Sequence, residues 1–287
     1  INWSNLLNSP GGGSPYGGDG FFLPSQDLVN AYQTDASGLP DFDYQSKSDY
    51  SQVTANDNNT YSLSNVTPSV DPRLDFVVGR PNISWKTYTK TPCKGWVRDK
   101  GTYGYNCTKR FWVSPESPDM MKGWPWGASQ MNWQIIRYAD VLLWKAEALI
   151  EIGSDLTTAR TLINKVRERA KNSSYVKDFT DKSKNAANYS IGLYAADNWT
   201  QDYARKALRT EMRLETAMEG ERFFDLVRWG IADKVMNNFL TVEKSKRIYY
   251  ANSKFTAGKD EYLAIPNNQY GFSGGIYVQN PGYAAFK

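Results

Sequence analysis

The sequence predicts a mainly α-helical protein of tetratricopeptide-like helical hairpins, with long irregular loops and a few short strands. Two observations carry this prediction. The second half of the chain holds three long segments whose apolar residues recur at helical spacing, and only a few residues separate the first two. Two helices joined by so short a turn pack antiparallel, as in a tetratricopeptide repeat. The first half, by contrast, is rich in Gly, Pro, Ser and Asn.

The elements of that first half, residues 1–131, are expected to be short. Residues 9–22 form a loop by composition, without the Gly-Lys-Ser/Thr ending of a phosphate-binding loop. Residues 24–32 predict one short helix, with Ser25 as its N-cap. Residues 37–64 predict a long polar loop, and residues 74–78 predict one strand.

The first long helix is expected to begin near residue 132 and to be buried on more than one side. Two adjacent apolar stripes run along it: Ile135, Ala139, Leu142, Ala146 and Leu149 in one, and Ile136, Leu143 and Ile150 in the other. We expect Gly153 to end this helix, and Ser154 or Asp155 to cap the next one.

The second helix is expected over residues 156–170, followed by a polar loop or insertion over residues 171–200. A third helix should run over residues 202–219, break at Gly220 and resume through residues 221–230. The tail contains one strand-like piece, residues 262–265, and otherwise turns. Residues 132–287 are therefore expected to form a helical region with an irregular tail.

Composition excludes several kinds of chemistry. The 287 residues contain no histidine and two cysteines, which removes Ser-His-Asp triads, imidazole-ligated metal and four-cysteine clusters. The net charge is +4 with basic and acidic residues interspersed, so nucleic acid is not an expected partner. No apolar run reaches the roughly 18 residues of a membrane helix. Because the chain starts at Ile1, we expect this start to be a processed or cut end.

The two cysteines, Cys93 and Cys107, lie 14 positions apart in one loop-rich stretch. A disulfide between them would suit an exported protein and would contribute about 3 kcal/mol in the chain-entropy model. Two unpaired thiols would suit a cytosolic protein. We favour the disulfide. No metal ligands or cofactor are predicted, and the sequence leaves calcium binding open, because its scattered Asp and Asn residues show no EF-hand-like spacing.

Six segments, taken together and in order, resemble the SusD/RagB family of outer-membrane nutrient-binding lipoproteins. They are FFLPSQDLVNAY, DPRLDFVVG, IIRYADVLLWKAEALIE, TARTLINKVRERA, ALRTEMRLETAMEGERFFDLVRWG and YLAIPNNQYGFSGGIYVQNPGY. The resemblance covers residues 21–283 but corresponds to the carboxyl-terminal half of a family member. It implies a non-enzymatic, lipid-anchored protein at the cell surface. Such a protein captures oligosaccharide, or in some relatives peptide, for a SusC-like TonB-dependent transporter.

The acidic residues of the third helix could be read as a catalytic pair. Glu211, Glu215 and Glu219 fall at i, i+4 and i+8 on one side of it. A glycosidase needs two carboxylates facing the sugar, one of them with a raised pKa. Because arginines are interleaved with these glutamates, we expect salt-bridged helix packing instead.

The aromatic residues divide by context. Trp133, Trp144 and Trp229 have apolar helical neighbours, so we expect them in the core. A second set lies in Gly/Pro/Lys-rich loops and is predicted to contact a ligand, because exposed rings can stack on sugar faces. Its members are Tyr44, Tyr61, Trp85, Trp96, Tyr103, Tyr105, Trp124 and Trp126. Packing against a missing amino-terminal half, or against the transporter, is the competing interpretation.

The sequence therefore predicts a non-catalytic glycan-binding protein for uptake through an outer-membrane transporter, anchored through the absent amino-terminal part. Two alternatives remain open. A peptide-capture lipoprotein would have a cleft of backbone-pairing groups in place of exposed rings. A helical-repeat interaction module without a small ligand would bury the loop aromatics.

Overall fold

A computed structural model describes residues 10–56, 60–93, 95–121 and 128–286, and the fold is given for these residues. They divide into two compact units, with the boundary between Gly220 and Glu221. The first unit contains the predicted helical hairpin and all described residues of the loop-rich region.

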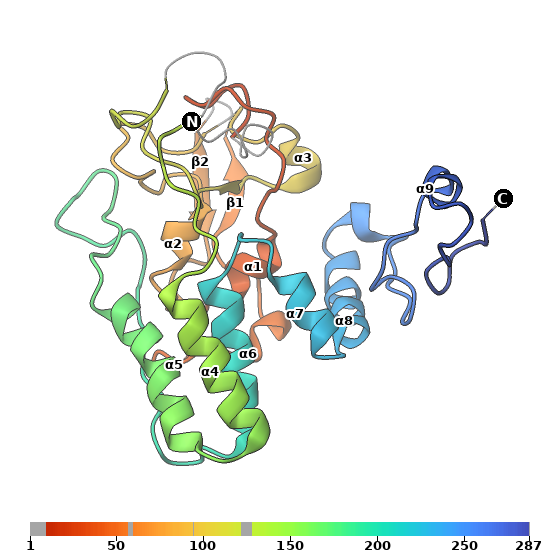
Figure 1. The fold of residues 1–287 in the computed structure, drawn as a ribbon. Coiled ribbons are helices and arrows are strands. Elements are labelled where there is room, and N and C mark those ends of the chain that lie inside the picture. The colour runs from red at the N-terminus through yellow and green to blue at the C-terminus, as the bar shows by residue number, and fades with distance from the viewer. Residues whose placement is uncertain (1–9, 57–59, 94, 122–127, 287) are drawn as a thin grey trace. The chain divides into compact units, whose positions relative to one another are not determined.

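Three helices form the helical part of the first unit: α4 (Tyr138–Ile152), α5 (Leu156–Lys171) and α6 (Gln201–Glu215). Figure 1 shows them side by side. The predicted helical hairpin is confirmed, since Gly153 ends α4 with φ +72° and the Asp155 carboxylate accepts the backbone N–H of Thr158 at 2.9 Å. The left-handed conformation at the end of a helix favours glycine.

The interface of these helices is built largely from small and branched side chains. The buried residues of α4 are Ala139, Leu142, Leu143, Ala146, Glu147 and Ile150. They pack with Ala159, Ile163 and Val166 of α5 and with Ala204, Ala207 and Leu208 of α6. The helix begins at Tyr138 rather than near residue 132, so Ile135 and Ile136 precede it and stay exposed. The predicted stripes are therefore right only within the helix.

The loop-rich region has a hydrophobic core of its own, and this core packs against α6. The predicted first helix is α1 (Gln26–Ala31), and Ser25 caps it by accepting the backbone N–H of Leu28 at 3.1 Å. Tyr32, directly after α1, is buried in this core and its hydroxyl donates to the Leu214 carbonyl at 2.8 Å. The loop-rich half thus has interior packing rather than only surface loops.

The predicted strand at residues 74–78 is wrong. Residues Leu74–Val77 form the short helix α2, and only Val78–Gly79 is extended, as strand β3. The Asp71 carboxylate accepts the backbone N–H of Arg73 at 2.9 Å, and the Asp71 carbonyl accepts that of Leu74 at 3.1 Å. These bonds start a turn where the apolar run alone favours a strand.

Short paired strands complete the loop-rich region. Strand β3 pairs antiparallel with β4 (Cys107–Thr108), and α3 (Lys100–Tyr103) precedes β4. The predicted polar loop at residues 37–64 contains a 3-10 turn, η2 (Tyr44–Ser46), and a hairpin of β1 (Gln52–Ala55) and β2 (Tyr61–Ser64). This hairpin could not be predicted from the sequence pattern, because only one of its strand residues is buried.

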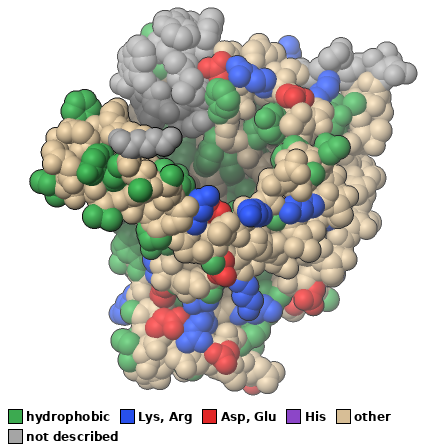
Figure 2. All heavy atoms as spheres, turned by 90° about the vertical axis from the view of Figure 1, so that its right-hand side faces the viewer, with side chains coloured by type: hydrophobic (Ala, Val, Ile, Leu, Met, Phe, Trp, Pro, Cys, Tyr) green, Lys and Arg blue, Asp and Glu red, His purple; other side chains and the backbone are tan. Residues whose placement is uncertain are grey.

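The second unit contains α7 (Arg222–Arg228), α8 (Ala232–Lys244), η3 (Ile248–Tyr250) and α9 (Asn267–Phe272). The break at Gly220 is confirmed, with φ +94°. Helix α8 was not predicted, and the predicted strand at residues 262–265 is irregular chain. Leu263, Ile276 and Val278 of this unit are highly exposed. Figure 2 shows hydrophobic side chains at the surface between charged ones.

Candidate functional site

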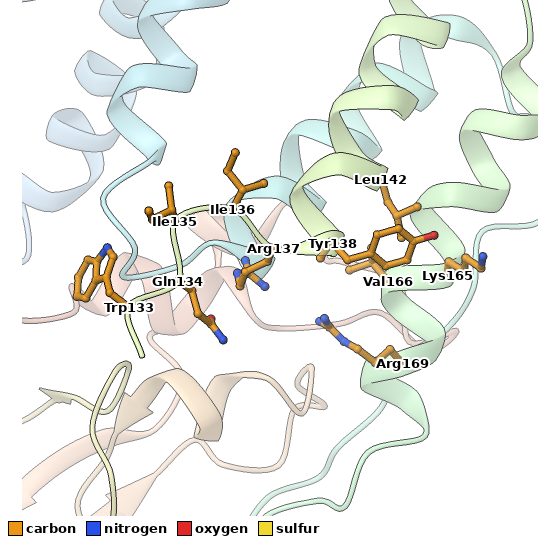
Figure 3. Close-up of a pocket in the computed structure, with 11 residues that line it drawn as sticks. Trp133, Gln134, Ile135, Ile136, Arg137, Tyr138, Leu142, Lys165, Val166 and Arg169 are labelled. Carbon is orange, nitrogen blue, oxygen red and sulfur yellow. The ribbon is translucent and has the colours of Figure 1, made fainter. Parts of the chain in front are cut away.

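The described residues of the first unit line three cavities. The first, of about 790 Å³, lies where the chain enters α4 and faces α5 (Figure 3). In Figure 3 the guanidinium groups of Arg137 and Arg169 lie near each other, between Trp133 on one side and Tyr138 on the other. The remaining wall is mostly apolar, with Ile135 among its members.

The apolar wall of this cavity corrects one prediction. Trp133 was expected in the core and is 51% exposed, and Trp144 on α4 is also about half exposed. Trp229 is half-buried. The helical pattern correctly predicts that the side of α4 facing α5 and α6 is buried. The opposite side of α4 carries large apolar residues, and no element among the described residues covers them.

The second cavity, of about 500 Å³, adjoins the first, because Gln134, Arg137 and Arg169 line both. Its lining includes part of an ionic network around two glutamates of α6, of which Glu215 lines the cavity and Glu211 lies behind it in the interior. Arg73 donates to Glu211 at 2.6 Å and to Glu215 at 3.1 Å. These groups are buried, so each ion is compensated by its partners rather than by water.

Further arginines complete the network. Arg167 donates to Glu211 at 2.8 Å, while Arg137 and Arg169 each donate to Glu215 at 2.7 Å. Arg137 and Arg110 also pair with Glu219, which lies beyond the end of α6 because this helix stops at Glu215 rather than at residue 219. All three glutamates are thus held by arginines. The predicted salt-bridged role is thus confirmed, although the partners come from other segments than the interleaved arginines.

The electrostatics of Glu215 exclude a role as a general acid. Burial on its own raises the pKa of this carboxyl, but Arg73, Arg169 and Arg137 outweigh it and hold the pKa at about 2. A glycosidase acid needs the opposite shift. The acidic side of α6 is therefore a structural joint between the helices and the loop-rich region.

The third cavity, of about 650 Å³, lies between α2, the chain at residues 84–89 and the chain at residues 174–182. The Ser84 hydroxyl donates to the Lys177 carbonyl at 2.9 Å, which fixes the two chain segments together. Four aromatic rings line the cavity: Phe76, Tyr88, Tyr175 and Phe179. Hydroxyl groups of Ser84, Thr87, Thr89 and Ser174 lie among them.

Four lysines also line this third cavity: Lys86, Lys109, Lys177 and Lys182. Lys182 places its Nζ 5.0 Å from the centroid of the Phe179 ring, a cation–π contact. None of the described residues that line the cavity is Asp or Glu. Aromatic faces, hydroxyls and ammonium donors thus meet in one concavity, which suits a hydroxylated ligand with apolar ring faces.

Two of the tryptophans predicted to contact a ligand, Trp85 and Trp96, are interior residues. Trp85 is 0% exposed and Trp96 is 2% exposed, and both belong to an aromatic core with Tyr16 and Trp112. The Trp85 indole donates to the Tyr16 hydroxyl at 2.8 Å. The prediction of ring faces open to a ligand is therefore wrong for these two. Glycine-rich flanks suggested surface loops, whereas the loops fold back over their own aromatic residues.

The other predicted aromatics are scattered. Tyr61 is buried and packs edge-on against Tyr105 at a centroid distance of 5.3 Å. The Tyr44 hydroxyl accepts a hydrogen bond from Arg213 at 2.5 Å and so takes part in an ionic contact. Tyr103, on α3, is 52% exposed. None of these four lines the three cavities.

Two predicted contacts, Trp124 and Trp126, lie outside the described residues. Sequence reasoning also missed the aromatic lining of the third cavity. Tyr175 and Phe179 occur in the interval at residues 171–200, which its polar composition marked as an insertion. The sequence did contain a signal for this lining: isolated aromatic residues in a polar interval. A polar loop has no core of its own to bury such rings, so they are candidates for a binding surface.

The predicted disulfide is wrong for the structure, because no bond joins Cys93 and Cys107 there. Cys107 is buried in strand β4, where its thiol contacts the Gly79 carbonyl at 3.4 Å, and burial raises its pKa. Cys93 is exposed. The prediction rested on compartment and spacing, neither of which fixes the distance between the two sulfur atoms.

Two searches restricted to the described residues bear on other classes of function. No cluster of three or more Cys, Asp or Glu side chains is placed to hold a metal ion. No helix there has the length and apolar composition needed to cross a bilayer.

Comparisons with known proteins agree with the resemblance found in the sequence. The profile of the SusD family matches residues 2–283. SusD-like protein P2 of Formosa agariphila is 31% identical over 156 residues, which are 54% of this chain and 26% of that protein. The chain thus spans about a quarter of the length of this curated relative.

Among solved structures, a SusD superfamily protein from Bacteroides vulgatus ATCC 8482 is similar with a TM-score of 0.61 and 19% identity. The match covers 99% of this chain and 49% of that one. A SusD-like carbohydrate binding protein from Bacteroides fragilis NCTC 9343 is 22% identical over 75% of this chain and 36% of its own, with a TM-score of 0.43 that supports no conclusion about the fold.

The first structural match supports the SusD-like fold, with the helical hairpin and the short strands in place. The family match covers almost the whole chain, and the family consists of non-catalytic binding proteins. The chain belongs to the SusD family.

Proposed function

We propose that this chain binds oligosaccharide without chemical change, and that the third cavity is its ligand site. The observation that carries the proposal is the meeting of four aromatic rings with hydroxyl and ammonium donors in one cavity of about 650 Å³. A pyranose presents an apolar C–H face that stacks on an aromatic ring, while its hydroxyls take directional hydrogen bonds. Membership of the SusD family supports this ligand class.

The cavity walls suit stacking because their rings are accessible. Phe76 is exposed, and Tyr88, Tyr175 and Phe179 are half-buried, so each keeps part of its ring open. Tyr175 packs edge-on against Tyr189 at 5.4 Å, and Tyr88 lies 6.3 Å from Trp96. Rings fixed in this way lose little conformational entropy when a ligand binds.

The wider role follows from the family and remains part of the proposal. The protein would lie at the cell surface, at the outer membrane, and deliver its ligand to a SusC-like transporter. The chain spans about half the length of its structural relative, so we propose that it forms the carboxyl-terminal part of one SusD-like domain. In that longer protein the amino-terminal part would carry the lipid anchor.

Isothermal titration of the protein against plant, host and microbial oligosaccharides tests the ligand class. We expect at least one glycan to bind, and we expect Phe179→Ala to weaken it about tenfold, in the range of stacking contacts. Phe22→Ala is the matched control, because Phe22 is exposed and lies outside the three cavities. Tyr103→Ala tests the exposed aromatic residue on α3 as an additional contact.

Two outcomes would overturn the proposal. If the full panel gives no heat while peptides bind, the protein captures peptides. If a glycan binds with the same affinity to wild type and to Phe179→Ala, the ligand lies outside the third cavity.

One observation favours a second role, that of a helical-repeat interaction module. The outward side of α4 and the chain before it expose Ile135, Ile136, Tyr138, Val141, Trp144 and Ile152. An apolar surface of this kind marks a protein contact more often than a sugar site. The two roles are compatible, since the first cavity faces this side and the third does not share a residue with it.

A further inference from the structure

The charges that line the second and third cavities are unbalanced. The second cavity is lined by five cationic side chains and one carboxylate, that of Glu215, and the third by four lysines. Lys86 and Phe76 line both, so the two cavities are adjacent. The arginines of the second cavity pair with Glu211, Glu215 and Glu219. The third cavity has no carboxylate among its described lining residues, and two carboxylates outside that lining, Asp75 and Asp178, interact with Lys109 and Lys182.

Lys86 has no hydrogen bond or ion pair with any described residue, although it lines both cavities. Its backbone has φ +51°, a conformation that costs a non-glycine residue free energy and clusters at ligand sites. Its surroundings desolvate it and Arg110 repels it, which together lower its pKa to about 8. Lys86 is thus an exposed cation with no anion bound to it among the described residues.

Lys109 contributes a second part of the excess positive charge in the third cavity. It is 2% exposed and donates to the carbonyls of Asp75 at 2.6 Å and Ser84 at 2.7 Å. The Asp75 carboxylate, which interacts electrostatically with Lys109, already accepts two hydrogen bonds from Arg80, at 2.9 and 2.7 Å. Asp75, Arg80 and Lys109 are all buried and carry a net charge of +1. An excess buried charge is costly unless an anion compensates it.

From this juxtaposition we infer that the third cavity takes an acidic glycan, whose carboxylate or sulfate group binds between Lys86 and Lys109 while a sugar face stacks on the cavity's aromatic rings. The inference rests on the proposed function and names the substrate class of that site. A charge-assisted hydrogen bond to an anion is shorter and stronger than a neutral one, so the lysines would select acidic over neutral sugars. The rings supply the part of the affinity that does not depend on charge.

The test titrates the protein with two matched pairs of oligosaccharides: an oligogalacturonate with its methyl ester, and a sulfated oligosaccharide with its desulfated form. We expect an acidic member to bind at least tenfold more tightly than its neutral partner. We expect Lys86→Gln to remove most of this difference and to leave the affinity for the neutral sugar within twofold. Lys90→Gln, a nearby exposed lysine outside the cavities, is the control and should change neither.

The outcomes distinguish the inference about acidic glycans from the proposed function of glycan binding. The pair that shows the preference identifies carboxylate or sulfate as the recognised group. Equal binding of acidic and neutral sugars, or an acid preference that survives in Lys86→Gln, overturns the inference and leaves glycan binding intact. Absence of binding by every glycan in the wider panel removes the proposed function and the inference with it.

Discussion

Arg73 and Glu215, 142 residues apart in the sequence, share a hydrogen bond of 3.1 Å in the interior of the first unit. The same guanidinium binds Asp71 beside it and Glu211 one turn earlier on α6. One arginine therefore joins the loop-rich region to α6. This joint matters for binding, because it holds α2, which contributes Phe76 to the third cavity, against α6.

Replacing Arg73 tests this joint. Arg73→Met leaves Asp71, Glu211 and Glu215 with fewer cations in a buried setting, and breaking such a network costs about 3 to 5 kcal/mol. Urea unfolding of the protein and the variant measures the difference. Arg98→Met is the control, because its pair with Asp19 is exposed and should contribute less than about 1 kcal/mol. If Arg73→Met lowers the free energy of unfolding by no more than Arg98→Met does, the network around Arg73 does not stabilise the protein.

The pKa of Glu215 predicts an acid dependence of stability. An unfolded glutamate has a pKa of about 4.3, and the folded value of about 2 is lower, so folding favours the ionised form. The contribution, of order 3 kcal/mol, is complete above about pH 5 and is lost as the pH falls toward 2. Free energies of unfolding measured between pH 2 and 7 should show this slope. Glu215→Gln should flatten it, and an unchanged slope would assign the acid sensitivity to other groups.

The aromatic core around Trp85 predicts an effect at Gly79. A Cβ added to Gly79 would overlap the Trp85 ring and approach the Cys107 thiol to 2.7 Å. Since both neighbours are buried, neither can move cheaply, and Gly79→Ala should destabilise the protein by about 1 to 3 kcal/mol. Gly12→Ala, with open space around the new atom, should have little effect. Thermal unfolding followed by tryptophan fluorescence compares them, and equal melting temperatures for the two variants would contradict the close packing.

Binding of an acidic glycan should weaken as the pH rises through about 8. Burial, helped by Lys86 and Arg80 and opposed by Asp75 and Cys107, lowers the pKa of Lys109 to about 8. An anion binds the protonated form, so affinity is fully present below this pKa and falls by up to tenfold per pH unit above it. Titrations at pH 6.5, 8 and 9.5 measure it. A neutral glycan should show no such trend, and a flat profile for the acidic one would place its charged group away from both Lys86 and Lys109.

Helix positions could be predicted from the sequence where a local signal and the tertiary context agree. Ser25, Gly153 and Asp155 mark helix ends as their residue types predict, because capping depends on neighbours a few positions away. The hairpin of α4 and α5 follows from their spacing. The strand expected at residues 74–78 failed because the Asp71 side chain starts a turn that outweighs the apolar run.

The site was harder to predict, because burial is a long-range property. Trp85 and Trp96 were expected at the surface and lie in the core, while Trp133 and Trp144 were expected in the core and lie about half exposed. The first pair is buried by segments distant in sequence, with Tyr16 as one partner. The third cavity joins residues 84–89 to residues 174–182, and nothing in either segment alone indicates the other.

The most direct test of the account is a crystal structure of the protein with a bound oligosaccharide chosen from the titration panel. We predict that the sugar occupies the third cavity, with a ring face on Phe179 or Tyr88 and, for an acidic ligand, its charged group beside Lys86. A sugar bound at the first cavity, against Trp133 and Tyr138, would contradict the central claim.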